Sequence, residues 1–340
     1  MAVPNSGPLA GPDAIRQTAQ KAEELGLDSV WVHDHISYGT EWLGHRASGV
    51  SEQISPETEP CFYESLSTLN FIAGFTKRID LGIGVLVLPL RNPLVVGRQL
   101  ITLQGLSEHR LVLGVAIGDY PAEFKVLGVP YRGRVGIFEE YLEVLHKIFH
   151  GGSVGYHGNL IGFDHGHFYP RVNPPPILIG GGVAAVPEPG EDQLVVPVLR
   201  RVARLGNGWM PDWGKPENIA QGISIIRDLA RSRGRGNIDF QVTFSTTLHL
   251  ANSDEEAVRK SAQSIDFAEQ TANIVSKFGT RTPRKKLEYS LIGSARTVTE
   301  RVEQYADAGV TRFKMMSLTP DVDSLLRMME KFTKEVASSF

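Results

Sequence analysis

The sequence predicts a single α/β domain, residues 1–340, folded as a (β/α)₈ barrel. Amphipathic helical stretches alternate about eight times with short runs rich in Val, Ile and Leu. Those runs are nearly continuous in apolar residues, which is typical of parallel strands covered on both faces. A chain of 340 residues suits one large barrel, and a doubly wound sheet is the alternative.

The first helix is expected over residues 13–26, because Pro12 is a good starter and Gly26 a good terminator. The strand of residues 27–35 follows it directly. The later predicted strands are residues 79–89, 110–119, 175–182, 207–211, 239–250, 285–293 and 310–318. The later predicted helices are residues 64–78, 93–107, 137–149, 194–206, 218–234 and 298–309, and a last one that starts at Asp321.

Two segments are too long for simple connections. They are residues 36–60 and residues 251–290, of which the second carries a helix of its own. Both follow predicted strand ends, where barrel enzymes form their pockets and lids. We therefore expect two insertions at the carboxyl-terminal face of the barrel.

Composition excludes several classes of partner. The formal net charge is -3 without a basic cluster, so we expect binding neither to nucleic acid nor to an anionic membrane. The longest apolar run, residues 81–90, contains two glycines and a proline and is far shorter than a membrane span. The single cysteine, Cys61, excludes an internal disulfide and fits a reducing compartment, so we expect a cytoplasmic protein.

The chemistry of a barrel lies at the carboxyl ends of its strands, and the first candidates there are His33, Asp34 and His35. A His-x-His pair could ligate a metal, with His249 as a further ligand, in a barrel hydrolase. One histidine with Asp34 could instead serve proton transfer or a polar cofactor edge. A polar strand end that only caps a loop is the third interpretation. We predict no metal site.

Glycines mark other strand ends. Gly180, Gly181 and Gly182 follow an apolar strand, where exposed backbone amides could hold a phosphate. A lone glycine triplet is also a common turn. Gly118 and Asp119 end the strand of residues 110–119.

Several strings in chain order resemble the bacterial luciferase-like flavin monooxygenase family. They are AEELGLDSVWVHDH, RIDLGIGVLVLPLRNP, HRLVLGVAIGD, FKVLGV, PPPILIGG, RLGNGWMP and SLIGSARTVTERVEQYADAGVTRF. The resemblance covers nearly the whole chain and implies a (β/α)₈ barrel that uses reduced FMN with oxygen, or the deazaflavin coenzyme F-420 as a hydride carrier. Members open with a full apolar first strand, whereas only residues 1–4 are present for it here, so the first strand is expected to be short or truncated.

The resemblance also implies roles for single residues. Asp34 and His35 match an Asp-His pair beside the flavin ring and substrate, and Gly84 and Val85 match a bulge that backs the ring through a cis peptide bond. Asp119 stands where deazaflavin sugar-phosphate dehydrogenases carry a glutamate acid. The expected catalytic residues are therefore His35 and Asp119. The expected cofactor-binding residues are Asp34, Gly84, Val85, Gly118, Gly180, Gly181 and Gly182.

The function that the resemblance implies is oxygenation of a small organic substrate by reduced FMN and O2, with a separate flavin reductase as a possible partner. The alternatives are an F-420-dependent dehydrogenase or reductase and, from other classes, a non-catalytic flavin-binding protein or the metal-dependent hydrolase. We also expect a homodimer, because relatives pair through the helices of residues 64–78 and 93–107.

Overall fold

The computed structural model describes residues 1–37, 61–184, 193–212, 214–236, 239–262 and 289–340. Most of the expected insertion 36–60, and residues 263–288 of the insertion 251–290, lie outside the described residues. The described beginning of the second insertion contains α9 (Asp254–Ala262), the helix that the sequence predicts there.

A parallel sheet forms the centre of the fold. Its pairing order is β1-β2-β3-β6-β9-β10-β11, and β12 also pairs with β10. The strands are β1 (Ser29–Val32), β2 (Asp80–Val87), β3 (Leu111–Ala116), β6 (Ile177–Gly180), β9 (Gly208–Met210), β10 (Gln241–Leu250), β11 (Leu291–Gly293) and β12 (Arg312–Ser317). Each lies within a run that the sequence predicts as a strand, because these runs are apolar and bounded by Gly, Pro or polar residues.

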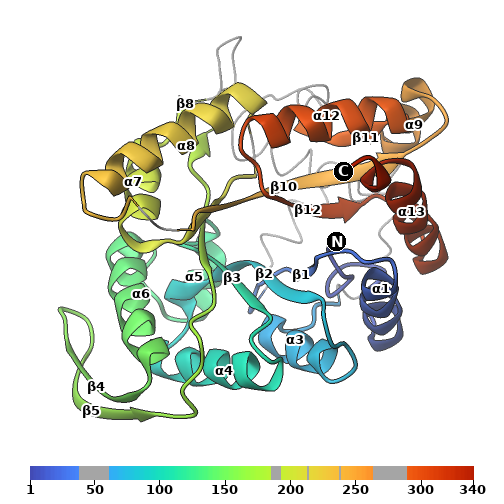
Figure 1. Ribbon diagram of the computed structural model, residues 1–340. Helices are drawn as coiled ribbons and strands as arrows, with labels where there is room; N and C mark the ends of the chain where they lie inside the picture. The colour runs from blue at the N-terminus through green and yellow to red at the C-terminus, as the bar shows by residue number, and fades with distance from the viewer. Residues whose placement is uncertain (38–60, 185–192, 213, 237–238, 263–288) are drawn as a thin grey trace.

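The amino-terminal residues complete the ring between β1 and β12. Ala2 donates its amide to the carbonyl of Met315 on β12 (2.8 Å), and Val3 donates to that of Trp31 on β1 (2.9 Å). Trp31 in turn donates to the carbonyl of Met1 (2.9 Å). The amino terminus accordingly lies between the two strands in Figure 1. Ala2 forms an isolated parallel bridge with Trp31, so residues 1–3 take the place of a short first strand, and the parallel strands curl into a barrel.

Helices surround the sheet (Figure 1). They are α1 (Pro12–Glu24), α3 (Ser65–Ala73), α4 (Pro93–Leu106), α5 (Pro121–Val126), α6 (Arg134–His150), α7 (Val196–Leu205), α8 (Pro216–Arg231), α12 (Ala295–Asp307) and α13 (Val322–Glu335). Side chains at four helix starts accept hydrogen bonds from first-turn amides: Glu64 on α3, Asn92 on α4, Ser294 on α12 and Asp321 on α13.

Several described features have no counterpart in the sequence prediction, among them a small antiparallel pair of β7 (Val183–Ala184) and β8 (Gln193–Leu194). The strands β4 (Gly152–His157) and β5 (Gly162–Phe168) pair as an antiparallel hairpin outside the barrel sheet (Figure 1). Their sequence is rich in glycine and polar residues, so it lacks the apolar run that marks a buried strand. The helix α5 has six residues, which is too short to display helical periodicity.

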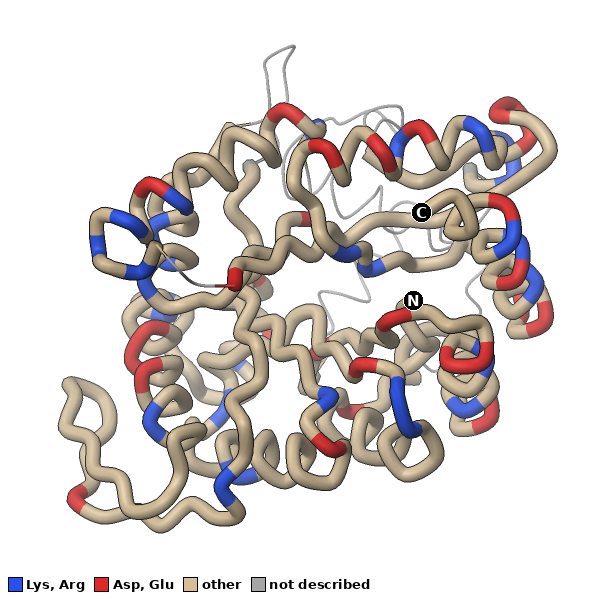
Figure 2. Tube along the Cα trace, in the orientation of Figure 1, with Lys and Arg blue, Asp and Glu red and all other residues tan. Residues whose placement is uncertain are grey.

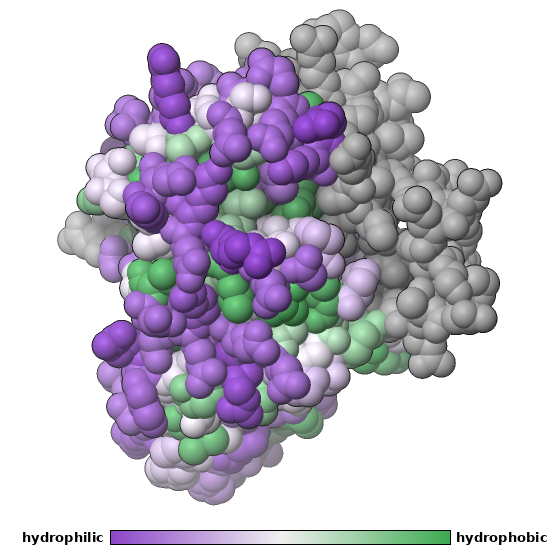
Figure 3. Space-filling model, turned by 90° about the vertical axis from the view of Figure 1, so that its right-hand side faces the viewer, coloured by the Kyte–Doolittle hydropathy of each residue, from purple (hydrophilic) through white to green (hydrophobic). Residues whose placement is uncertain are grey.

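The outer surface carries charges of both signs. In Figure 2, basic and acidic residues are interspersed along the outer helices. In Figure 3, the face that carries α1 and α13 is mainly hydrophilic, and its apolar patches are interrupted by hydrophilic residues. None of the described helices is long and apolar enough to cross a membrane.

Glycines on one strand make room for large side chains on the next inside the barrel. Trp31 of β1 is fully buried, and a Cβ added to Gly82 on the paired strand β2 would lie 2.3 Å from its ring. Real Cβ atoms do not approach other atoms so closely, so this glycine is required by packing. At the amino-terminal ends of the strands, Arg312 of β12 donates to Asp80 of β2 (2.8 Å), and this bond links the two strands.

We expect Gly82→Ala to destabilise the protein by about 1–3 kcal/mol, because the added methyl group must displace the Trp31 ring. The matched control is Gly136→Ala on α6, where an added Cβ meets nothing within 4 Å. That control should be neutral or gain up to about 1 kcal/mol from helix propensity. Denaturant unfolding of the three proteins measures both effects, and equal stability of the two variants would contradict the packing argument.

Candidate active site

The carboxyl ends of β1 and β2 are joined by Asp34. Its carboxylate accepts hydrogen bonds from the Ser65 hydroxyl (2.7 Å), the Val87 amide (2.9 Å) and both terminal nitrogens of Arg91 (2.5 and 2.8 Å). Asp34 is buried, and the fork of the guanidinium matches its two oxygens. Asp34, which the sequence analysis assigns to the cofactor, is therefore held by three protein groups. Its bond to the Val87 amide fixes the carboxyl end of β2 relative to that of β1.

His35 is held by a carboxylate that the sequence analysis did not identify. Its Nδ1 lies 3.1 Å from Oε2 of Glu123, which is a buried residue of α5. The His35 side chain keeps 35% of its surface exposed, whereas that of Glu123 keeps 1%. Phe62 packs edge-on against the imidazole, with ring centroids 5.9 Å apart. This arrangement fixes the orientation of the ring while leaving part of it accessible.

Glu123 is itself held in the ionised form. Burial alone would raise the pKa of its carboxyl, but hydrogen bonds from His35 and from the amides of Ile36 and Ser37 lower the pKa below its usual value. The Ile36 amide donates to Oε1 at 2.5 Å and the Ser37 amide at 3.2 Å. A carboxylate beside the imidazole favours a proton on Nδ1 of His35.

The bulge that the resemblance implies is present in β2. The register with β3 shifts between Ile83 and Leu86, so that Gly84 and Val85 lie opposite the single residue Gly114. The peptide bond Gly84–Val85 is cis, as expected. A Cβ on Gly84 would lie 2.6 Å from the end of Met210 and 2.9 Å from Cδ of Lys314, so these side chains would have to shift to admit it.

A buried lysine lies on the inner side of this bulge. Nζ of Lys314, on β12, donates to the Gly84 carbonyl (2.5 Å) and lies 3.3 Å from Nδ1 of His33. Burial lowers the pKa of Lys314 to about 8, and the negative charge of Asp212 acts in the opposite direction, raising that pKa. Burial also lowers the pKa of His33 well below its usual value, and the charge of Lys314 adds to that effect. His33 is therefore neutral and accepts from the lysine.

The other predicted residues lie at the ends of β3 and β6. Gly118 has a φ of 74°, and its carbonyl accepts from Nε of Arg134 (2.9 Å). Asp119 is exposed, and its carbonyl accepts from the Tyr131 hydroxyl (3.3 Å). The carboxylate that contacts His35 is thus Glu123, four residues further along the chain.

The glycine triplet forms a close approach between strand and helix. Gly181 and Gly182 have φ values of 90° and 102°. The Trp209 indole donates to the Gly181 carbonyl (2.6 Å), and a Cβ on Gly182 would lie 2.8 Å from that indole nitrogen. A Cβ on Gly181 would meet no described atom within 4 Å, so space remains beside this turn among the described residues. The Gly181 amide itself donates to the Met210 carbonyl (3.2 Å). That space is compatible with the predicted phosphate site.

The metal interpretation has no support in the described part of the chain. No group of three or more His, Cys, Asp or Glu side chains there could hold a metal ion. His33 contacts Lys314, His35 contacts Glu123, and His249 lies against the Leu318 carbonyl (3.1 Å). The strand β1 ends at Val32, before the pair, so strand alternation does not place the two histidines on one face.

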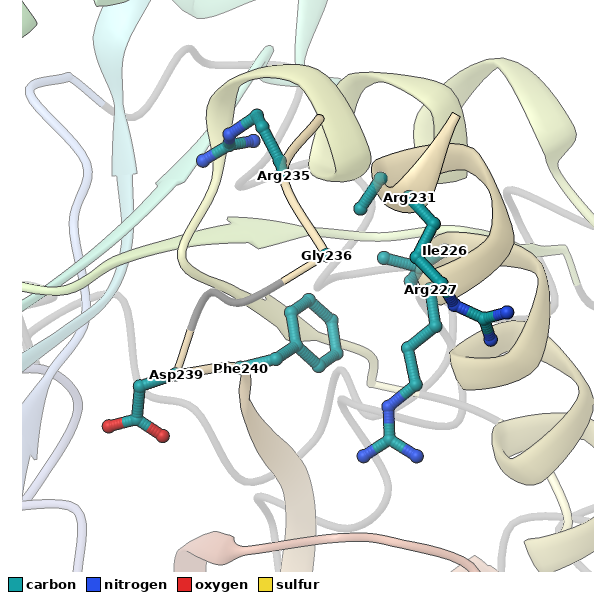
Figure 4. A pocket seen from close by; sticks show the side chains of 8 residues that line it. Ile226, Arg227, Arg231, Arg235, Gly236, Asp239 and Phe240 are labelled. Atoms are coloured by element: carbon teal, nitrogen blue, oxygen red, sulfur yellow. The ribbon is translucent and has the colours of Figure 1, made fainter. Parts of the chain in front are cut away.

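A cavity of about 270 Å³ lies at the opposite end of β10 from these residues, against the last turn of α8. Figure 4 shows the Phe240 ring pointing toward Ile226 and Arg227, whereas the guanidinium of Arg235 points away from them. Arg235 donates to the carbonyls of Ala203 (2.7 Å) and Gly206 (2.9 Å). This cavity is at the amino-terminal end of the barrel, and Arg235 in its wall holds the carboxyl end of α7 through these two hydrogen bonds.

Three site residues escaped the sequence analysis, namely Glu123, Arg91 and Lys314. Each acts through a partner far away in sequence, so no local spacing marks it. The signal for Lys314 was a charged residue inside an apolar run that had been predicted as a strand.

The arrangement offers a flavin-type ring three kinds of contact. The bulge Gly84–Val85 supplies a shaped surface, the turn at Gly181 supplies open space beside a backbone, and Lys314 supplies a positive charge. His35 with Glu123 supplies a proton-transfer pair at the same end of the barrel. A buried positive charge beside the bulge is compatible with an anionic aromatic ring.

Comparison with known proteins agrees with this chemistry. The family described as luciferase-like monooxygenase matches residues 2–312. The F420-dependent glucose-6-phosphate dehydrogenase of Kineococcus radiotolerans is 26% identical over 323 residues, which cover 88% of this chain and 86% of that protein. The 5,10-methylenetetrahydromethanopterin reductase of Methanopyrus kandleri is 21% identical over 358 residues, covering 94% and 93%.

Solved structures share the fold. The monooxygenase RslO1 from Streptomyces bottropensis superposes with a TM-score of 0.77 at 21% identity, covering 100% of this chain and 98% of that one. An F420-dependent secondary alcohol dehydrogenase, solved with an F420-acetone adduct, gives a TM-score of 0.75 at 17% identity, with coverages of 97% and 95%.

We expect Glu123→Gln to lower the free energy of unfolding by about 1–3 kcal/mol at pH 7, because a buried charged hydrogen-bond acceptor is lost. The native carboxyl has a lowered pKa, so its contribution is complete above the usual carboxyl pKa and is lost as the pH falls through the native value. The difference between the two proteins should therefore shrink toward pH 3.

Denaturant unfolding at pH 7, 5 and 3 measures this difference. The control is Glu300→Gln, which removes an exposed carboxylate that pairs with Arg296 on the same helix. That control should change stability by no more than about 0.5 kcal/mol at any pH. A Glu123→Gln effect that is equally large at pH 3 and pH 7 would contradict the assignment.

Proposed function

The chain belongs to the luciferase-like monooxygenase family, and from that premise we propose that it is an oxidoreductase that transfers a hydride between coenzyme F-420 and a small alcohol or carbonyl substrate. The observation that carries the proposal is the pair His35–Glu123, held beside the bulge at the carboxyl end of the barrel. Hydride transfer to or from an alcohol carbon requires a group that takes or gives the hydroxyl proton.

The bound cofactor would supply the hydride acceptor or donor. The protein's residues would do the rest. His35 would exchange the substrate's hydroxyl proton at Nε2, while Glu123 orients the ring through Nδ1 and stabilises its positive charge. Asp34 would act as a positioning residue, because its bonds to Arg91 and Val87 hold the strand that carries the bulge.

The relatives support this choice. The Kineococcus relative aligns with most of the chain and is named for F-420, and the same cofactor chemistry occurs in a solved structure of this fold. The cofactor phosphate would lie against the turn of Gly180, Gly181 and Gly182, beside the space at Gly181. Gly118 and Asp119 would border the same pocket from the end of β3.

The second candidate is oxygenation of an organic substrate by reduced FMN and O2, which the sequence resemblance favours. The likeness of the fold to the monooxygenase RslO1 is consistent with it. A proton-transfer group such as His35 serves this reaction as well, and the reduced FMN would come from a separate flavin reductase.

Reconstitution distinguishes the two candidates. The purified protein is mixed with F-420 or FMN, oxidised or reduced, and binding is measured anaerobically by the change in absorbance. We expect F-420 to bind and to be reduced by a member of a panel of small alcohols without oxygen. Oxygen uptake that requires reduced FMN and substrate would establish the second candidate instead. Binding of neither cofactor would exclude both.

We expect His35→Ala to lower turnover by about 10²–10⁴, as is typical for loss of a general acid or base. Cofactor affinity should change much less, because the bulge and the glycine turn remain intact. Steady-state kinetics and a binding titration of the same variant measure the two quantities. Loss of cofactor binding, with normal turnover of the bound fraction, would move His35 from proton transfer to the cofactor site.

We also propose a homodimer through α3 and α4. Leu66, Leu69 and Ile72 of α3 are buried within the protomer, so the apolar surface left for a partner is smaller than the sequence suggests. Phe71 and Phe75 pack edge to face, and Arg16 lies over both rings.

The exposed apolar side chains that remain on α4 are Val95 (58% exposed) and Leu106 (69%). We expect sedimentation of the wild type at micromolar concentration to give a dimer, and Val95→Asp to shift it toward monomer. A wild-type monomer under these conditions would exclude this interface.

A further inference from the structure

Lys314 is a buried cation at the centre of the barrel. It is 3% exposed, and its aliphatic stem lies against Gly84, where an added Cβ would approach Cδ within 2.9 Å. Its ammonium group donates to the Gly84 carbonyl and contacts His33. In Figure 2 the basic residues of β12 appear as blue segments in the middle of the molecule, away from the charged outer helices.

Lys314 makes no ion pair with a described carboxylate. The negative charge of Asp212, beyond the end of β9, acts on it and raises its pKa against the effect of burial. The groups that face it from the surrounding elements are His33 beyond β1, the Gly84 carbonyl on β2 and the Met1 ammonium. Two further charges of the barrel interior, Asp80 and Arg312, pair with each other.

The other cation at this end of β2 is already neutralised. Arg91 donates to both oxygens of Asp34 and approaches Glu64 within 3.7 Å. Among the described residues, Lys314 is thus a positive charge beside the bulge with no carboxylate at ion-pair distance, although the charge of Asp212 acts on it. A buried ammonium without such a partner is unfavourable for stability, whereas a methionine of similar length would fill the same space without a desolvation penalty.

We propose that Lys314 is the countercharge for the anionic ring of the reduced cofactor, held next to the bulge Gly84–Val85. The inference rests on the proposed function, since it requires that a flavin or deazaflavin ring binds there. Transfer of a hydride adds two electrons and one proton to either ring, so the reduced ring carries one more negative charge than its oxidised form; for FMN the oxidised ring is neutral. Lys314 would therefore stabilise the reduced form over the oxidised one, and would act as a positioning residue for the Gly84 carbonyl.

The proposal has a defined dependence on pH. The lysine has a pKa of about 8 in the ligand-free protein, and an anionic ring beside it raises that pKa. Binding of the reduced cofactor is then coupled to proton uptake, so its affinity falls as the pH rises above 8. Relative to a variant without the lysine, the expected loss from pH 7 to pH 9 is about tenfold. Oxidised FMN, whose ring is neutral, should show no such loss.

The experiment compares wild type, Lys314→Met, Lys314→Gln and the control Lys147→Met, which removes an exposed lysine of α6. Dissociation constants of oxidised and reduced F-420, and of oxidised and reduced FMN, are measured anaerobically at pH 7 and pH 9. The quantity of interest is the ratio of the oxidised to the reduced dissociation constant. A change in the shape of the pocket affects both forms, so it largely cancels in the ratio.

At pH 7 we expect the ratio of the oxidised to the reduced dissociation constant to fall at least tenfold in Lys314→Met. The pH dependence of that ratio should then reflect only the ionisation of the free cofactor. Lys314→Gln keeps a donor for the Gly84 carbonyl without the charge, so it should lose the same preference. Lys147→Met should match wild type. In the ligand-free protein, thermal unfolding at pH 7 should show Lys314→Met at least as stable as wild type.

An unchanged ratio in both Lys314 variants would overturn the proposal. A lower thermal midpoint of the Lys314 variants together with an unchanged ratio would assign the lysine to structure alone. If neither cofactor binds wild type in either redox state, the proposed function fails and this inference falls with it. Binding of either cofactor with an unchanged ratio overturns the inference only.

Discussion

The buried pair Asp34–Arg91 is the interaction on which the candidate site depends. The Asp34 carboxylate accepts hydrogen bonds from Arg91, the Ser65 hydroxyl and the Val87 amide. It therefore connects the segment after β1 to the start of α3 and to the carboxyl end of β2. Removing one partner of such a pair typically costs about 3–5 kcal/mol, because the other charge stays buried without compensation. The positions of the bulge before Val87 and of the histidines on either side of Asp34 both follow from this junction.

Three successive residues at the end of β1 occupy three electrostatic environments. His33 lies against a lysine and is kept neutral, Asp34 lies against an arginine, and His35 lies against a carboxylate. Each partner comes from a different segment, since Lys314 is on β12, Arg91 follows β2 and Glu123 is on α5. Neighbours in sequence can therefore perform separate tasks, because protonation is controlled by the partner rather than by the residue type.

Close packing of large side chains against glycines gives the inner surface its shape. Trp31 lies over Gly82, Met210 and Lys314 lie over Gly84, and Trp209 lies against Gly182. Every one of these glycines would bring an added Cβ within 3 Å of its neighbour. These contacts fill the space beside the bulge, and in a barrel the carboxyl ends of the strands, where the bulge and the turn at Gly181 lie, are the expected place for a ligand.

The sequence by itself determined the order of the strands of the barrel sheet and of most helices around it, and the end of the barrel expected to carry the chemistry, because apolar runs and helix caps are local signals. It also singled out Asp34, His35 and the bulge through a family resemblance. Only the tertiary structure decided which groups act together. The pairing of His35 with Glu123 and of Lys314 with the Gly84 carbonyl joins positions 88 and 230 residues apart. Such pairs arise only when the strands close into a barrel, since burial and strand register, rather than spacing along the chain, bring the charges into contact.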